Sequence, residues 1–94
     1  MSNIRFIWDQ TKAENNRRKH SVSFEEAQTV FHDDLAQLIP DPDHSDVEQR
    51  FILLGRSNHL RLLIVCHCYR ENDSLIRIIS ARKATKREGK LYPG

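Results

Sequence analysis

The residues with the most chemical content lie in the last twenty positions of this 94-residue chain. Arg77 interrupts an otherwise apolar strand pattern over residues 75–81. An arginine inside such a strand is costly unless it has a partner or a function. A basic segment follows at once, in which a single acid, Glu88, accompanies five bases: Arg82, Lys83, Lys86, Arg87 and Lys90. A cationic strand beside a cationic helix suits an anionic polymer such as RNA.

Two neighbouring strand patterns carry side chains that could meet Arg77. Arg50 begins the strand predicted over 50–55, and His67 and Tyr69 share one face of the strand predicted over 61–70. If the faces of these strands coincide, Arg50, His67, Tyr69 and Arg77 converge at one end of a sheet surface. The register of the strands decides this, and the sequence does not specify register.

Such a group suits cleavage of RNA without a metal. The 2′-hydroxyl must lose a proton, the pentacoordinate phosphate needs cations around it, and the departing 5′-oxygen needs a proton. Arginine binds phosphate oxygens through paired hydrogen bonds, and histidine, tyrosine or a carboxylate can transfer the protons. The hypothesis is that Arg50, Arg77 and Arg82 hold the phosphate, while His67 or His20 moves the protons. The sequence leaves four candidates for the general base: His20, His67, Tyr69 and Glu88.

Each of these residues also has a purely structural interpretation. Arg77 could form an ion pair with Glu88, which lies on one stripe of the predicted C-terminal helix. His67 and Tyr69 could be ordinary strand residues near a sheet edge. His20 could simply end its helix, where the helix dipole favours it.

The first predicted helix, over residues 10–20, has an unusual stripe. Asp9 is placed to cap its N-terminus. Its only apolar residue is Ala13, and the stripe that continues from Ala13 carries Asn16 and His20. Either these two side chains are satisfied by hydrogen bonds in the core, or they face a site.

The remaining pattern predicts a single α+β domain over residues 1–94. A second helix begins after Ser23, which forms a capping box with Glu26, and a basic helix begins at Ser80 or Ala81. Strands are predicted over 4–8, 35–40, 50–55, 61–70 and 75–81. This order predicts an antiparallel sheet of about four to five strands with two N-terminal helices and one C-terminal basic helix.

Composition excludes several other classes of protein. With 38% hydrophobic and 30% charged residues, the chain is globular rather than disordered. No apolar run is long enough to cross a bilayer, and the N-terminus lacks the pattern of a signal peptide, so we expect a cytoplasmic protein without a membrane segment. Cys66 and Cys68 lie about 6.5 Å apart on one strand face, which is awkward for a disulfide, and His67 points away from both. No second ligand pair follows at zinc spacing, so neither a metal nor a cofactor is expected.

The net charge of +2 is unevenly distributed, because both ends of the chain are basic and the middle is acidic. Residues 33–48 carry acids and no base. The segment 41–48 lacks the glycine and the spacing of a calcium loop. We expect it either to dock a basic partner or to keep its face free of nucleic acid.

Several blocks together resemble one family. These blocks are FIWDQTKAENNRRKHSVSFEEAQTVF (6–31), RFILLGRS (50–57) and IRIISARKATKREGKLY (76–92). They resemble BrnT-type toxins of bacterial type II toxin–antitoxin pairs, which are small ribonucleases with a RelE-like fold. The matching positions are Trp8, Asp9, Lys12, Asn16, Lys19, His20, Arg50, Gly55, Arg56, Arg77, Ser80, Arg82, Thr85, Glu88 and Tyr92. Two positions depart from the family pattern: Gln10 replaces a proline, and Ser21 replaces a glycine at an expected left-handed helix end.

The resemblance implies a toxin that cleaves RNA without a metal, inhibits translation and is neutralised by a cognate antitoxin. It also implies a BrnA-like antitoxin with a ribbon-helix-helix DNA-binding end, a heterotetramer of toxin and antitoxin, and contact with operator DNA only through the antitoxin. The catalytic candidates are Arg50, His67, Arg77, Arg82, His20 and Glu88. The RNA-binding candidates are Lys19, Arg56, Tyr69, Lys83, Lys86 and Arg87. The alternatives are a noncatalytic module that binds RNA or an antitoxin, and a structural partner of a DNA-binding protein.

Overall fold

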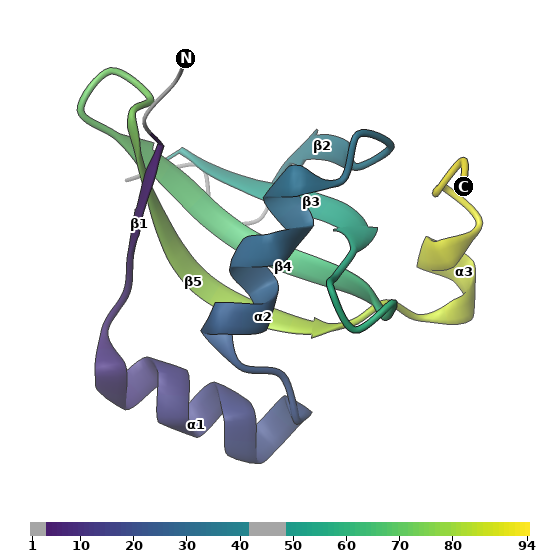
Figure 1. Ribbon diagram of the computed structural model, residues 1–94, viewed down its shortest axis with the longest axis horizontal. Helices are drawn as coiled ribbons and strands as arrows, with labels where there is room; N and C mark the ends of the chain where they lie inside the picture. Colours follow the sequence, from purple (N-terminus) through teal and green to yellow (C-terminus); the bar gives the residue numbers. More distant parts are fainter. Residues whose placement is uncertain (1–3, 42–48) are drawn as a thin grey trace.

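The computed structural model describes residues 4–41 and 49–94, which form one layer of strands with helices on both faces (Figure 1). The expected order of strands and helices is confirmed, with one additional 3-10 turn (η1) after the second helix. The elements are β1 Arg5–Ile7, α1 Gln10–His20, α2 Phe24–Thr29, η1 Val30–His32, β2 Gln37–Pro40, β3 Arg50–Arg56, β4 Leu62–Arg70, β5 Leu75–Lys83 and α3 Lys86–Gly89.

The sheet is mixed, so the prediction of an antiparallel sheet is wrong for one strand. The strand order is β1-β5-β4-β3-β2, with antiparallel pairs except between β1 and β5, which run parallel. The first strand of the chain therefore pairs with the last, although two helices and three strands of the described residues lie between them in the sequence. A strand pattern indicates that a segment is extended but not which neighbour it takes, and this long-range pairing was not predictable from it.

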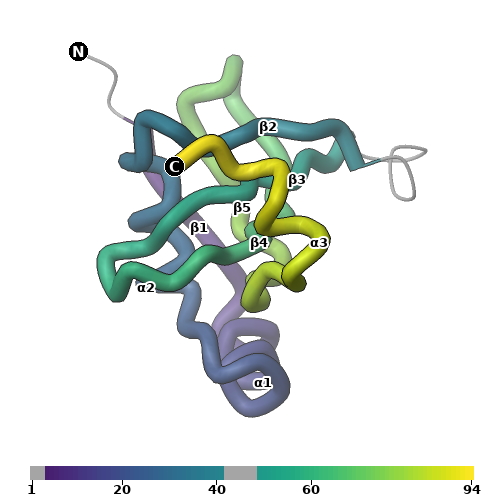
Figure 2. The backbone as a smooth tube through the Cα atoms, turned by 90° about the vertical axis from the view of Figure 1, so that its right-hand side faces the viewer, coloured from purple at the N-terminus to yellow at the C-terminus, as the bar shows by residue number. Residues whose placement is uncertain are grey.

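The core lies between the sheet and α2. Leu53, Leu63, Val65, Ile78 and Ala81 point from three central strands towards this helix and are buried. The facing side chains come from the turn before α2, from α2 itself and from η1: Val22, Phe24, Ala27 and Val30. Figure 2 shows α2 on one side of the strands and α3 on the other.

The predicted caps of the N-terminal helices are largely confirmed. Asp9 accepts a hydrogen bond from the Thr11 backbone N–H at 2.9 Å, and Ser23 accepts one from Glu26 at 3.0 Å. Ser21 has a φ of 58°, the left-handed helix end expected there. Glu26 does not return the capping bond, because its carboxylate binds Arg61 and Ser57 instead.

The predicted C-terminal basic helix is wrong in its start and its length. β5 continues to Lys83, because β4 extends far enough for Lys83 to pair with Leu63. The helix itself is only α3, and it begins after Thr85, which forms a capping box with Glu88. The spacing Thr-x-x-Glu is a sequence signal for this start that the prediction missed.

Candidate functional site

The strand register places Arg50 and Arg77 in one row on the face of the sheet opposite α2. Arg50 pairs with Cys68, and Cys68 pairs with Arg77. Directly paired residues share a face, and two strand spacings put the Cα atoms of the two arginines about 10 Å apart. Both side chains are partly exposed, and neither guanidinium forms a hydrogen bond or ion pair with another described residue. Two cations at this distance can approach the same anion or neighbouring phosphates.

His67 and Tyr69 lie on the other face, so the predicted convergence of these two residues with Arg50 and Arg77 is wrong. His67 pairs with Phe51 and Ile78, and it is fully buried. Its Nδ1 lies 3.1 Å from the Val65 carbonyl oxygen and its Nε2 3.3 Å from the Tyr69 hydroxyl. Since a carbonyl only accepts, Nδ1 carries the proton and Nε2 accepts from the tyrosine.

The surroundings of His67 are those of a core residue. Its ring packs edge-on against Phe31 and Tyr69, with centroid distances of 4.8 and 5.2 Å. Burial lowers the pKa of His67, and it raises the pKa of Tyr69. The interpretation of both as ordinary strand residues fits this placement, but the expected position near a sheet edge is wrong, because β4 is the central strand of the five described.

Arg82 shares the face of Arg77 but is separated from it. It pairs with Ile64, four residues along β4 from Cys68, or about 13 Å. Its guanidinium donates two hydrogen bonds of 2.8 Å to the two carboxylate oxygens of Glu88. These bonds lower the pKa of Glu88 to about 2. Glu88 thus pairs with Arg82 and not with Arg77, and the three arginines do not surround one shared anion pocket.

A β-bulge decides that Arg82 is on this face at all. Cys66 pairs with Ser80 while His67 pairs with Ile78, so Ile79 has no partner on β4. The extra residue shifts the alternation by one, which brings Ser80 and Arg82 to the face of Arg77.

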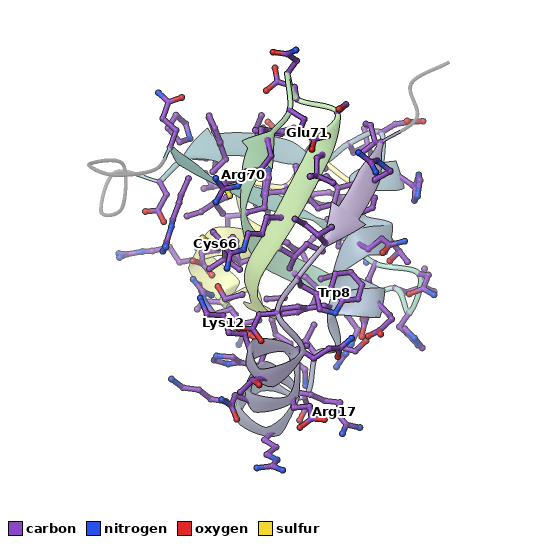
Figure 3. All side chains as sticks on the ribbon, turned by 90° about the vertical axis from the view of Figure 1, so that its left-hand side faces the viewer. Trp8, Lys12, Arg17, Cys66, Arg70 and Glu71 are labelled. Carbon is purple, nitrogen blue, oxygen red and sulfur yellow. The ribbon has the colours of Figure 1, made fainter. Side chains whose placement is uncertain are left out.

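A cationic cleft of about 230 Å³ lies beside the bulge, between α1 and β5. Its lining includes three basic side chains, Lys12, Lys19 and His20, together with Ser80. Ser80 pairs with Cys66 and Arg77 pairs with Cys68, so Ser80 is the next position along β5 on the face of Arg77. The cleft therefore adjoins the row formed by Arg50 and Arg77, which we call the arginine row. Figure 3, which views the sheet along its edge, shows Lys12 and Cys66 on the side of the sheet away from α2.

Asn16 and His20, the two polar residues on the stripe of α1, have different roles, and Asn16 is satisfied by hydrogen bonds in the core. It is buried, and its amide donates to the carbonyl oxygens of Val22 and Ala81 at 3.0 and 2.8 Å. Its oxygen accepts from the Ala81 N–H at 3.1 Å. Asn16 therefore fastens α1 to β5, whereas His20, the other polar residue of the stripe, lines the cleft.

The other predicted RNA-binding residues are spread over the α3 end of the sheet. Lys83, Lys86 and Arg87 are exposed. Arg56 lies at the end of β3, with its guanidinium 5.3 Å from the ring centroid of Tyr92. The acidic segment predicted to dock a partner falls on residues 42–48, outside the described residues, apart from Asp41.

Lys12 and Ser80 line the cleft but were not predicted as catalytic or RNA-binding residues. In the sequence they stood out only as positions that match the family pattern. The signal available was the helical spacing of Lys12, Lys19 and His20, which places the three side chains towards one side of α1. The bulge that brings Ser80 beside them has no comparable signature.

The described residues offer little support for other kinds of site. Among residues 4–41 and 49–94, no group of three or more histidine, cysteine, aspartate or glutamate side chains is placed to hold a metal ion. Both cysteines are present as thiols, and burial with the nearby Asp41 carboxylate raises the pKa of the Cys66 thiol, which disfavours a thiolate nucleophile. No helix in the same residues is long and apolar enough to cross a membrane.

Comparison with known proteins identifies a family and a similar fold. A sequence model of the family described as ribonuclease toxin, BrnT, of type II toxin–antitoxin system matches residues 8–88. The crystal structure of the Brucella abortus ribonuclease toxin BrnT is similar to the chain, with a TM-score of 0.68 and 22% sequence identity. The match covers 88% of this chain and 99% of that one, and at this identity it concerns the fold. No curated protein matches the chain.

Proposed function

Since the chain belongs to the BrnT family of ribonuclease toxins of type II toxin–antitoxin systems, we propose that it is an endoribonuclease that cleaves RNA without a metal. The observation that carries the proposal is that Ser80, which lines the cationic cleft, lies next to Arg77 of the arginine row on the same face of the sheet. This surface offers cations for a phosphodiester and one imidazole for proton transfer.

The phosphate contacts are assigned to four cations. Arg50 and Arg77 lie in one row with no carboxylate partner among the described residues, so their guanidinium groups can bind phosphate oxygens. Lys12 and Lys19 reach the same surface from α1 and add charge beside Ser80. Cations so placed stabilise the extra negative charge of the pentacoordinate phosphate.

Proton transfer is assigned to His20. It lines the cleft, whereas His67 is buried on the opposite face with both ring nitrogens occupied. His20 takes the proton from the 2′-hydroxyl, the 2′-oxygen attacks phosphorus, and the 5′-oxygen leaves with a proton from a general acid or water. The products are a 2′,3′-cyclic phosphate and a 5′-hydroxyl end. Glu88 is assigned a structural role, in which it binds the Arg82 guanidinium, and no proton transfer.

The biological role follows the family. We infer that the chain has a RelE-like fold and that its cleavage of RNA inhibits translation in the cytoplasm. A cognate antitoxin is inferred to neutralise the toxin. The antitoxin is proposed to be BrnA-like, with a ribbon-helix-helix end that contacts operator DNA and a heterotetrameric complex with the toxin.

The test is incubation of the purified chain with RNA, with and without a chelator, followed by analysis of the cut ends. Cleavage should persist in chelator and leave cyclic phosphate ends. His20→Ala and Arg77→Ala should each slow it at least about 100-fold. Arg18→Ala is the matched control, because Arg18 is exposed on α1 and lines none of these clefts.

Wild-type cleavage rates in both His20→Ala and Arg77→Ala would contradict the assigned residues. Tight binding of RNA that stays intact would instead support a noncatalytic module. Replacing any one of the four phosphate-binding cations by alanine should also reduce the slope of log affinity against log salt by about 0.7.

A further inference from the structure

A second cleft lies at the far end of β3, between η1, the β3–β4 loop and the C-terminal segment. Its volume is about 430 Å³. Its lining includes His32, Asp33, Arg56, Ser57, Asn58 and Tyr92. Neither the arginine row nor the α1–β5 cleft includes any of these residues.

The chemistry of this cleft differs from that of the α1–β5 cleft. Its lining balances one guanidinium, Arg56, against one carboxylate, Asp33, so it lacks the excess positive charge that a phosphate needs. It contains instead an aromatic ring, Tyr92, with the Arg56 guanidinium 5.3 Å from the ring centroid. Unpaired nucleobases stack on aromatic rings and on guanidinium planes of this kind.

The cleft is held open by contacts that occupy its carboxylate. Asp33 accepts hydrogen bonds from the Tyr92 hydroxyl at 2.6 Å and from the Arg56 backbone N–H at 2.8 Å. Gly55 permits this approach, because a Cβ there would lie 2.8 Å from Val30 Cγ1 and 3.2 Å from Asp33 Oδ2. The Tyr92 ring is therefore fixed in the folded protein rather than ordered by a ligand.

Two polar groups in the cleft remain available for a ligand. Asn58 is exposed, and its side-chain amide nitrogen donates to no other described residue. The His32 ring lines the same cleft. An amide and an imidazole can read the donors and acceptors on the edge of a base.

The cleft lies within reach of the proposed RNA surface. Arg56 and Arg77 are two strands apart, and Arg56 lies six residues further along β3 than Arg50, which is in the row of Arg77. These offsets correspond to about 22 Å between Cα atoms. A single strand of several nucleotides can therefore contact both positions.

We propose that this cleft binds one unpaired nucleobase of the RNA substrate and thereby influences where the RNA is cut. The inference rests on the proposed ribonuclease function. Phosphates bind the arginine row and the α1–β5 cleft, and a base stacks at Tyr92 with its edge towards Asn58.

The test is a titration of the purified, isotope-labelled chain with each of the four nucleoside 5′-monophosphates, followed by NMR. At least one nucleotide should shift the signals of Asn58, Arg56 and Tyr92 in a saturable way. Ribose 5-phosphate, which lacks a base, should leave these signals in place. Tyr92→Leu should weaken nucleotide binding about tenfold, and Tyr92→Phe, which keeps the ring, should bind nearly as the wild type does.

Because Tyr92 also anchors the C-terminal segment, Asn58→Ala provides a second variant on an exposed side chain. It should keep the fold and change which nucleotide binds best, and it should alter the preferred cleavage sites in RNA. Arg18→Ala removes an exposed positive charge on α1, away from this cleft, and as a control it should leave nucleotide binding unchanged.

Three outcomes would overturn the proposed base-binding site. Ribose 5-phosphate could produce the same signal shifts as the nucleotides, or the nucleotides could shift only signals of residues in the α1–β5 cleft. The third is that the signals of Asn58, Arg56 and Tyr92 shift with the antitoxin and with no nucleotide. Failure of the base site and failure of the ribonuclease function are distinguishable. RNA cut at unchanged sites by both Tyr92→Leu and Asn58→Ala would refute the base site alone. Nucleotide bound at Tyr92 with RNA left uncut would refute the ribonuclease function and retain the base site.

Discussion

Replacement of Asn16 by alanine should lower the free energy of unfolding by about 3–5 kcal/mol. Asn16 joins α1 to β5 by hydrogen bonds, and the residue is only 7% exposed. The substitution removes three hydrogen bonds, two to the Ala81 backbone and one to the Val22 carbonyl oxygen. It leaves three backbone polar groups without a partner in the interior.

The magnitude follows from the cost of those three groups. A buried polar group left unpaired costs about 1–3 kcal/mol, which gives a range of about 3–9 kcal/mol if the three costs add. The α1–β5 cleft lies directly beside Asn16 and can admit water to some of these groups. We therefore expect a value in the lower part of the range.

Urea unfolding followed by circular dichroism measures this change. Asn15→Ala is the matched control, since Asn15 is exposed on the same helix and the substitution should change stability by less than about 0.5 kcal/mol. Asn16→Asp keeps an acceptor for the Ala81 N–H but turns a carboxylate towards two carbonyl oxygens, so it should also destabilise. A decrease of less than about 1 kcal/mol in Asn16→Ala, or equal decreases in Asn15→Ala and Asn16→Ala, would refute this account of the clamp.

Three further predictions concern pH and packing. Hydrogen bonds from Arg82 lower the pKa of Glu88 from 4.5 to about 2, so their contribution to stability is present above pH 4.5 and lost as the pH falls towards 2. Glu88→Gln should flatten this acid dependence in urea titrations, and an unchanged slope would contradict the pairing. Burial lowers the pKa of His67 below 6.5, so the unfolded chain binds the proton more tightly and stability should fall as the pH drops below 6.5. His67→Phe should reduce this dependence in thermal unfolding, and a wild-type slope would show that protonation of His67 is not its source. Gly55→Ala places a Cβ 2.8 Å from Val30 Cγ1 and should cost about 1–3 kcal/mol, seen as a lower Tm; a variant with the wild-type Tm would mean that the backbone yields there.

Features that depend on neighbouring residues were predictable from the sequence. Asp9 and Ser23 cap their helices, and Ser21 takes the left-handed conformation that the family pattern implied. These features need only the local chain, because a cap satisfies backbone groups two or three residues away. The error at the C-terminal helix had another cause: the partner strand β4 extends to Leu62 and keeps residues up to Lys83 in the sheet.

Features that depend on register were not predictable. Strict alternation along β5 would place Arg77 and Arg82 on opposite faces, and the bulge at Ile79 places them on the same face. The same register turns His67 into the core and away from Arg50. The choice of His20 over His67 for proton transfer therefore rests on the tertiary structure.

By itself the sequence determined the chemical groups available, the helix caps and most of the strand segments, because these depend on residue type and short-range spacing. The tertiary structure decided which of those groups share a surface. Side chains alternate with a period of two along a strand, so one extra residue, or a different neighbouring strand, reverses the face on which each group lies. The arginine row, the cleft at Ser80 and the burial of His67 all follow from long-range pairings that local patterns do not specify.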